Sequence, residues 1–127
     1  MKYLLDTHSV IWYLKASPEL PKKIRDLIHN NETGIYISSV SLWEIVIKMS
    51  LGKLDINMPL DELLDIIKSK DFNILQIEDE CLKKLSNLPF IHKDPFDRLI
   101  ISTALAENLI IITADENIKK YDVSWIW

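Results

Sequence analysis

Short apolar runs alternate along the chain with longer segments in which apolar residues recur every three or four positions. The apolar runs predict strands at residues 2–5, 34–38, 72–77 and 109–113, with a further short strand at 123–127. The periodic segments predict helices at residues 7–15, 21–30, 39–51, 59–69, 78–88 and 96–107, with a short helix at 115–120. Strands that alternate with helices indicate an α/β fold, in which a central parallel sheet of four to five short strands is flanked by helices on both faces.

Two acidic residues directly follow predicted strands. Asp6 stands after residues 2–5, and Asp115 stands two residues after the run LIIIT at 109–113, which is apolar throughout as a central strand should be. In open parallel sheets, ligands bind beyond the carboxyl ends of the strands. Asp115 can equally cap the short helix that follows it. A charged residue at the end of a buried strand is unfavourable unless something binds it, so Asp6 is the stronger candidate.

The stretch HKDPFDRLI at residues 92–100 contains a second pair of acids. Asp94 can cap the helix, Pro95 suits its first position, and Asp97 falls in the first turn, where an acid is favoured by the helix dipole. On a helical wheel, Asp97 shares a face with the apolar residues that should pack on the sheet. We therefore predict a capping role for Asp94 and a position at the rim of the sheet for Asp97.

Glu44 lies about one turn into the helix that follows the strand at 34–38. Its helical wheel places it in a polar sector with Lys48, and a surface ion pair at i,i+4 would explain both residues. The buried stripe of this helix is predicted to contain Ile45 and Val46. The position of Glu44 near the same rim nevertheless makes it a candidate fourth acid of the site.

Four carboxylates near one rim would repel each other without a counter-charge. Hard divalent cations, Mg²⁺ or Mn²⁺, take oxygen ligands and would relieve that repulsion. His8, His29 and His92 lack the spacing of zinc ligands, and we interpret His8 and His92 as loop or helix-start residues. The chain also has no glycine-rich phosphate loop and no nucleophile elbow.

Composition narrows the classes of protein further. The 127 residues suit one domain, 1–127, and the net charge of −4 argues against a broad basic face for nucleic acid. The single cysteine, Cys81, is interpreted as an inert helix thiol and suits a reducing cytoplasm. No apolar run is long enough for a membrane helix, and Asp6 and His8 interrupt the only candidate for a signal peptide. The paired lysines at 22–23, 83–84 and 119–120 are interpreted as solvated surface.

Four motifs together resemble one known family. They are LLDTH at 4–8, SSVSLWEI at 38–45, HKDPFDRLI at 92–100 and IIITADE at 110–116. In this order and spacing they are similar to the PIN-domain ribonucleases, specifically the VapC-type toxins of toxin–antitoxin pairs. The resemblance covers essentially the whole chain. It implies a metal-dependent endoribonuclease that cleaves RNA with metal-activated water, with Mg²⁺ or Mn²⁺ as cofactor.

The resemblance also assigns roles to residues. Asp6, Glu44, Asp97 and Asp115 would be the catalytic acids, with Asp6 and Asp97 as the main metal ligands. Thr113 matches a hydroxyl often found beside the last acid and is a candidate contact with substrate. Lys93 and Arg98 flank the site, are candidate contacts with substrate as well, and could neutralise phosphate charge. The implied partners are RNA, a cognate antitoxin that occludes the site and a second copy in a homodimer. The tryptophans are predicted to pack in the core or to serve such an interface, namely Trp12, Trp43, Trp125 and Trp127.

Two other classes of function remain open at this stage. A phosphatase of the haloacid dehalogenase type, or a response-regulator receiver, also places an acid after the first strand. The phosphatase needs a second acid two residues later, where this chain has His8, and the second and third predicted strands end in Ser38 and Ile77 rather than acids. A non-catalytic interaction domain would use the acids only as helix caps and surface pairs.

Overall fold

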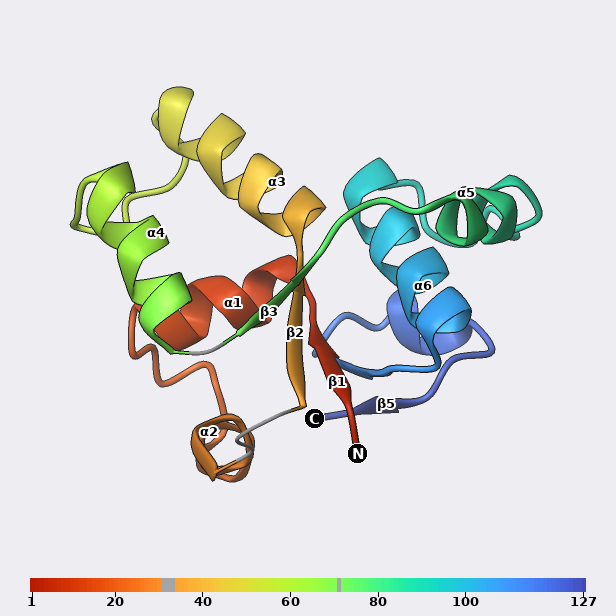
Figure 1. The fold of residues 1–127 in the computed structure, drawn as a ribbon, viewed down its shortest axis with the longest axis horizontal. Coiled ribbons are helices and arrows are strands. Elements are labelled where there is room, and N and C mark those ends of the chain that lie inside the picture. The colour runs from red at the N-terminus through yellow and green to blue at the C-terminus, as the bar shows by residue number, and fades with distance from the viewer. Residues whose placement is uncertain (31–33, 71) are drawn as a thin grey trace.

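Five short parallel strands form the centre of the molecule in a computed structural model that describes residues 1–30, 34–70 and 72–127 (Figure 1). They are β1 (Tyr3–Leu5), β2 (Ile35–Ser38), β3 (Asn73–Leu75), β4 (Ile110–Ile112) and β5 (Trp125–Ile126). Their order in the sheet is β3-β2-β1-β4-β5, and each neighbouring pair is parallel. The predicted fold class is thus confirmed.

Helices cover both faces of the sheet. They are α1 (Thr7–Leu14), α2 (Lys22–Asn30), α3 (Ser39–Ser50), α4 (Leu60–Ser69), α5 (Asp79–Ser86) and α6 (Pro95–Glu107), followed by the 3-10 turn η1 (Ile118–Lys120). Figure 1 shows α1 to α4 on one side of the strands and α5 and α6 on the other. The elements match the predicted ones closely, although most of them are shorter by one or two residues at an end.

The two largest hydrophobic core clusters lie on the two faces of the sheet because successive strand residues point to opposite faces. Tyr3 and Leu5 of β1 belong to the core beneath α1 to α4, whereas Leu4 between them belongs to the core beneath α6. Leu4 and Leu5 are fully buried. Covered faces and a strand on either side make β1 the most enclosed part of the sheet, so a charged residue at its end needs specific partners.

The order of the strands creates a switch point between β1 and β4. From β1 the chain moves outward on one side to β2 and β3, and it then returns to place β4 on the other side of β1. The loops after β1 and β4 therefore diverge and leave a crevice at the carboxyl edge, which is where open α/β sheets bind their ligands. Asp6 follows β1 and Asp115 follows β4, so the two acids stand on either side of this crevice.

Three helices begin at the same edge, and each has a polar side chain at its start. Asp6 accepts a hydrogen bond from the Ser9 amide at the start of α1, and Ser38 accepts one from Val40 at the start of α3. At the start of α6, Oδ1 of Asp94 accepts from the amide of Phe96 at 2.8 Å. The predicted capping role of Asp94 is confirmed. The cap fixes the first turn of α6, which carries Asp97.

The predicted helix at 115–120 is mostly a turn. Oδ1 of Asp115 accepts hydrogen bonds from the amides of Asn117 at 2.7 Å and Ile118 at 3.1 Å, so the side chain closes an Asx-type turn at this point. The 3-10 turn η1 is all that follows. Asp115 is thereby fixed at the rim by two backbone amides.

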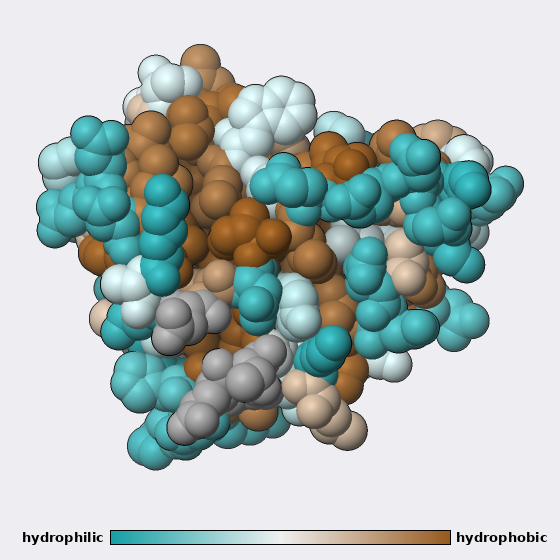
Figure 2. Space-filling model, in the orientation of Figure 1, coloured by the Kyte–Doolittle hydropathy of each residue, from teal (hydrophilic) through white to brown (hydrophobic). Residues whose placement is uncertain are grey.

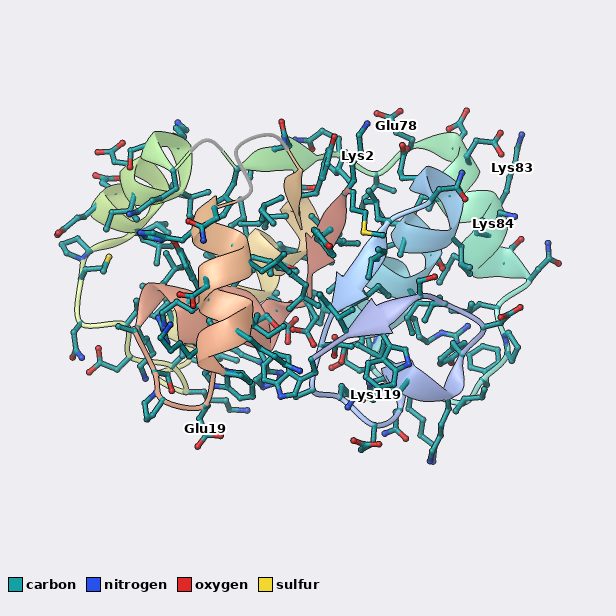
Figure 3. All side chains as sticks on the ribbon, turned by 90° about the horizontal axis from the view of Figure 1, so that it is seen from below. Lys2, Glu19, Glu78, Lys83, Lys84 and Lys119 are labelled. Carbon is teal, nitrogen blue, oxygen red and sulfur yellow. The ribbon has the colours of Figure 1, made fainter. Side chains whose placement is uncertain are left out.

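Charged side chains lie mainly around the outside of the fold. Lys83 and Lys84 project from α5 into solvent, as predicted (Figure 3). Lys119 differs from the prediction, since its ammonium group lies 4.4 Å from the centre of the Trp125 ring and its side chain is only 17% exposed. Figure 2 shows hydrophobic side chains reaching the surface over α3. In the part of the chain that the structure describes, no helix has both the length and the apolar character needed to cross a bilayer.

Candidate active site

The four candidate acids meet at the carboxyl edge of the sheet from four different elements. Asp6 follows β1, Glu44 lies on α3, Asp97 lies in the first turn of α6, and Asp115 follows β4. Asp6, Glu44 and Asp97 are buried, with 2%, 4% and 7% of their surface exposed. Their charges are close enough that Asp6, Glu44 and Asp115 all act on the ionisation of Asp97. The structure thus brings together residues that are far apart in the sequence.

Asp6 ties three elements together through both of its carboxylate oxygens. Oδ1 accepts from the Ser9 amide at 2.9 Å, and Oδ2 accepts from the Thr113 hydroxyl at 2.5 Å. The Ser9 hydroxyl in turn donates to the carbonyl of Ile112 at 3.0 Å. Burial raises the pKa of Asp6, and the hydrogen bonds from Ser9 and Thr113 oppose that rise. Asp6 is therefore fixed in one orientation by its own helix and by the neighbouring strand.

Thr113 has a different setting from the expected contact with substrate. Its side chain is fully buried, and its hydroxyl donates to Asp6 while it accepts from the Asp115 amide at 3.0 Å. One hydroxyl thus links the two acids that follow β1 and β4. Because its donor and acceptor functions are both used within the protein, Thr113 positions acids at the rim of the sheet.

Asp97 has the most strongly altered ionisation in the cluster. Burial raises the pKa of its carboxyl from 3.8 to about 8, and repulsion by the neighbouring acids contributes to the rise. In order of size, these neighbours are Asp94, Asp6, Glu44 and Asp115. Without a compensating cation, Asp97 therefore holds its proton at neutral pH.

Glu44 is more deeply buried than its place in a polar sector predicted. Its Oε2 pairs with Lys48 at 2.8 Å, so the expected i,i+4 pair exists, yet Lys48 is 34% exposed while the Glu44 side chain is only 5% exposed. The other oxygen, Oε1, is buried and has no hydrogen-bond partner among the described residues. A buried carboxylate oxygen without a donor is costly, and it indicates that something else binds there. The prediction that Val46 is buried was wrong, because 36% of its surface is exposed.

His92 is a loop residue just before α6, as predicted, but its side chain lies among the acids, which the sequence did not indicate. Its Nε2 is 3.0 Å from Oδ2 of Asp97 and 3.3 Å from Oδ2 of Asp115, and the residue is only 9% exposed. The pKa of Asp115 is lowered: burial raises it, but the amides of Ile118 and Asn117 and the nearby His92 outweigh that effect. The only signal in the sequence is the spacing of His92 before the DPFD motif.

Arg98 is buried, and its setting differs from the expected one beside phosphate. Its guanidinium donates to the carbonyls of Leu88 at 3.2 Å and Pro89 at 2.8 Å. It lies 3.9 Å from the centre of the Phe90 ring. The Tyr121 hydroxyl accepts from the His92 amide at 2.8 Å and donates to Pro89 at 2.6 Å. Arg98 and Tyr121 therefore fix the segment that presents His92, and Arg98 is a structural residue.

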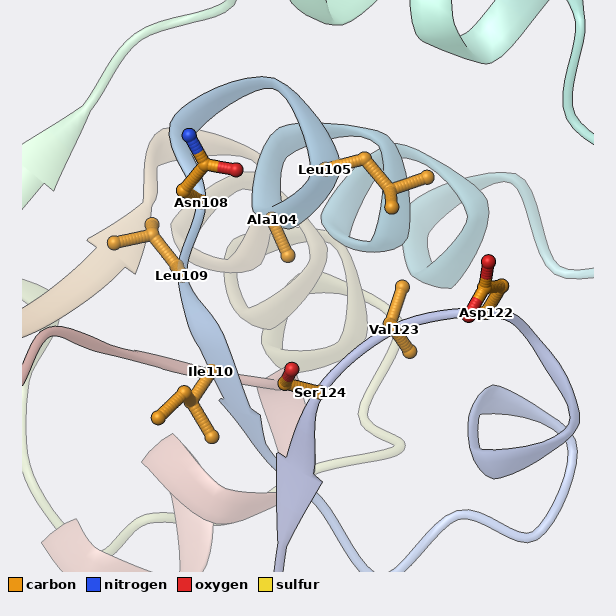
Figure 4. Close-up of a pocket in the computed structure, with 8 residues that line it drawn as sticks. All are labelled: Ala104, Leu105, Asn108, Leu109, Ile110, Asp122, Val123 and Ser124. Atoms are coloured by element: carbon orange, nitrogen blue, oxygen red, sulfur yellow. The ribbon is translucent and has the colours of Figure 1, made fainter.

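The cavities of the described residues distinguish this edge of the sheet from the opposite one. A cavity of about 180 Å³ is lined by Asp6, His8, Trp12, Ala114 and Asp115, so it opens directly onto two of the acids. Another, of about 270 Å³, lies between the end of α6 and the start of β5 (Figure 4). It contains Asn108 and Asp122 but none of the four acids. Of these two cavities, the first therefore adjoins the candidate site.

The cluster fits a hard divalent cation. Its ligand atoms are carboxylate oxygens, which Mg²⁺ and Mn²⁺ prefer, and Oε1 of Glu44 is a buried oxygen without another partner. Bound positive charge would also favour ionised Asp97 over its protonated form. Asp6, Glu44 and Asp97 offer such oxygens, and Asp97 also belongs to a group with His92 and Asp115 whose ligand atoms all lie within 4.8 Å of one another.

Comparison with known proteins assigns a family to this arrangement. Residues 3–124 match the family model of the PIN domain, a span that includes all four acids. The chain belongs to the PIN domain family. A search of curated proteins returned no match.

Solved structures share the fold of this PIN domain along almost its whole length. VapBC2 from Rickettsia felis, bound to a DNA fragment from the promoter, has a TM-score of 0.76 at 24% identity and covers 99% of this chain and 98% of its own. DNA-bound VapBC from Salmonella typhimurium has a TM-score of 0.75 at 18% identity, covering 99% and 97%. A toxin–antitoxin complex from Klebsiella pneumoniae has a TM-score of 0.67 at 17% identity, also covering 99% and 97%.

The raised pKa of Asp97 gives the metal-free PIN domain a specific pH dependence. The contribution of a carboxyl group whose pKa is higher in the folded than in the unfolded protein is fully present below the pKa of the unfolded state. For Asp97 this contribution to stability is lost as the pH rises through about 8. We therefore expect Asp97→Asn to increase the free energy of unfolding in chelator, by on the order of a few kcal/mol at pH 8 and by little at pH 4. Urea denaturation across this range measures the difference. If the free energies of unfolding of the wild type and Asp97→Asn differed by the same amount at every pH, this expectation would be contradicted. The control is Asp26→Asn, which removes the surface ion pair between Lys22 and Asp26.

The contacts of Arg98 predict a loss of stability even with a conservative substitution. Lysine keeps the charge but cannot donate to Leu88 and Pro89 at once. We expect Arg98→Lys to destabilise the protein by roughly 1.5–3 kcal/mol, the range for hydrogen bonds to a charged group. Thermal denaturation with and without denaturant measures it. Unchanged stability together with weakened RNA binding would instead place Arg98 on the substrate.

Proposed function

We propose that this PIN domain is a metal-dependent endoribonuclease of the VapC toxin type, inhibited by a cognate antitoxin. The observation that carries the proposal is the convergence of four acids on one crevice, with a buried and unpaired oxygen on Glu44. Membership of the PIN family supports a nuclease. The resemblance of its motifs to VapC-type toxins adds RNA as the substrate.

Each acid then has a separate task at the site. Asp6 and Asp97 are the principal ligands of the cation, and Glu44 contributes its free Oε1. When bound, Mg²⁺ or Mn²⁺ would activate water and polarise the scissile phosphodiester. Thr113 keeps Asp6 oriented, and the Asn117 and Ile118 amides keep Asp115 at the edge of the crevice.

Lys93 is the basic residue best placed to meet the phosphate backbone. It is exposed and lies in the chain between the cap Asp94 and His92, whose ring contacts Asp97 and Asp115. Arg98, the other expected phosphate contact, is committed to Leu88 and Pro89. With a net charge of −4, the chain has no excess of positive charge for duplex binding, so RNA should bind weakly and with marked dependence on salt and cation.

The setting of Asp6 favours hydrolysis by water over a phosphoaspartate mechanism. A nucleophilic carboxylate must bring an oxygen into contact with the phosphorus, and a phosphate group cannot approach Asp6 closely because the residue is only 2% exposed. The strand order also differs from the 2-1-3-4-5 order of receiver-type folds. These features weigh against the phosphatase and receiver alternatives.

The exposed surface of α3 supports a protein partner. Trp43 and Leu51 are each 61% exposed, with Val46 between them at 36%. Trp43 also packs edge-on against Phe96 of α6, with ring centres 5.4 Å apart, so the apolar surface reaches the element that carries Asp97. Its place beside the acids suits an antitoxin that occludes the site. A homodimer of the chain remains part of the proposal.

Loss of either principal ligand should abolish cleavage without unfolding the protein. We expect Asp6→Asn and Asp97→Asn to reduce RNA cleavage by more than the roughly 10–100-fold that loss of an outer-shell partner costs. Cleavage of a single-stranded RNA in Mn²⁺ measures this, together with mapping of 5′-phosphate ends. Asp26→Asn, an exposed acid on α2, is the matched control and should cleave normally. Equal cleavage by all variants would overturn the proposed function.

A further inference from the structure

The hydrogen bonds of His92 fix which ring nitrogen carries the proton. The backbone amide of Asp94 can only donate, and it lies 3.1 Å from Nδ1 of His92. Nδ1 is therefore an acceptor without a proton, and the neutral ring carries its proton on Nε2. That N–H points to the two carboxylates within reach, Oδ2 of Asp97 at 3.0 Å and Oδ2 of Asp115 at 3.3 Å.

The same hydrogen bond prevents His92 from acting as a metal ligand in this conformation. Nε2 of His92, with oxygens of Asp97 and Asp115, forms a group whose ligand atoms all lie within 4.8 Å of one another, close enough to surround an ion. To ligate it, however, Nε2 would have to lose its proton to Nδ1. Nδ1 would then direct an N–H at the N–H of Asp94. The ring is therefore a hydrogen-bond donor to Asp97 and Asp115.

The segment that carries His92 is too well fixed for the ring to turn away easily. The amides of Ile91 and His92 both donate to the Tyr121 hydroxyl, at 3.0 and 2.8 Å. Nη1 of Arg98 donates to the Pro89 carbonyl at 2.8 Å and lies 3.4 Å from that of His92. Arg98 and Tyr121 are both buried. The backbone on each side of the ring is thus held by side chains from α6 and from the segment after η1.

We propose that the Nε2–H of His92 bridges Asp97 and Asp115 in place of a second cation. The candidate site then holds one divalent cation, on the side of Asp6, Glu44 and Asp97. Nucleases with two metal ions place them roughly 3.5–4 Å apart. Here the Nε2–H of His92 is directed at the Oδ2 atoms of both Asp97 and Asp115, so a second ion bound between these two oxygens would meet that hydrogen. Oδ1 of Asp115 already accepts from the amides of both Asn117 and Ile118.

His92 is on this view a positioning residue, and the inference rests on the proposed metal dependence. Its donor orients Asp97 and Asp115 from one atom, although they belong to different elements. It also leaves Oδ1 of Asp97 outside this hydrogen bond, and Oε1 of Glu44 has no partner at all among the described residues. These two oxygens, with Asp6, are the ligands that remain for the single cation.

Two substitutions separate the two nitrogens of the ring. His92→Gln places an amide N–H near the position of Nε2, so it keeps the bridge to Asp97 and Asp115. His92→Asn places an oxygen near the position of Nδ1, so it still accepts from Asp94 but no longer reaches the two acids. His29→Asn is the matched control, since His29 contacts Tyr13 and none of the acids.

The experiment counts Mn²⁺ ions bound per chain by electron paramagnetic resonance of the free ion, with the full chain freed of metal beforehand. We expect one ion for the wild type, His92→Gln and His29→Asn, and two for His92→Asn. Thermal unfolding of each variant checks that it is folded. If His92→Asn does not fold, the number of ions bound to the wild type still tests the proposal.

Two ions on the wild type would overturn the proposal, as would a single ion on folded His92→Asn. No bound Mn²⁺ on the wild type would contradict the proposed metal dependence itself, which is a separate failure.

Discussion

The packing of several carboxylates into one buried space is the constraint on which the rest of this structure depends. The parallel sheet creates it, because strands that run in one direction end at one edge and the switch point between β1 and β4 opens that edge. Asp6 and Asp115 arrive on the two diverging loops, and Asp97 arrives on the first turn of α6. The cost is visible in the pKa of Asp97, which burial and neighbouring charge raise to about 8. A bound cation would offset this cost.

Most of the surrounding hydrogen bonds can be understood as ways of holding these acids in place before anything binds. The Thr113 hydroxyl links Asp6 to the Asp115 amide, so the two loops are tied together where they leave β1 and β4. His92 reaches Asp97 and Asp115 with one N–H. Asp6, Asp97 and Asp115 are thus oriented by hydrogen-bond donors from other parts of the chain. Such preorganisation keeps ligands at the right separation and lowers the cost of ordering them when a cation binds.

The sequence predicted the elements well and the site in part, for physical reasons. Periodicity marks helices and strands directly, and acids that follow strands of a parallel sheet must gather at one edge, so Asp6, Asp97 and Asp115 could be predicted. The role of His92 could not, because it depends on the path of an aperiodic segment that Tyr121 fixes from thirty residues away in the sequence. The contacts of Arg98 with Leu88 and Pro89 could not be predicted either, because they involve the same segment. The wheel placed Glu44 on a polar face correctly, but it could not show that this face turns toward the other acids.

The central claim is that the buried carboxylates form a cation site whose charge is balanced by a proton until the cation arrives. The most direct test is the number of protons released when Mn²⁺ binds, measured by calorimetry in buffers of different ionisation enthalpy. With a pKa of about 8, Asp97 should release close to one proton per chain at pH 7 and much less at pH 9. Binding of Mn²⁺ with no proton release at pH 7, or no binding at either pH, would contradict the account.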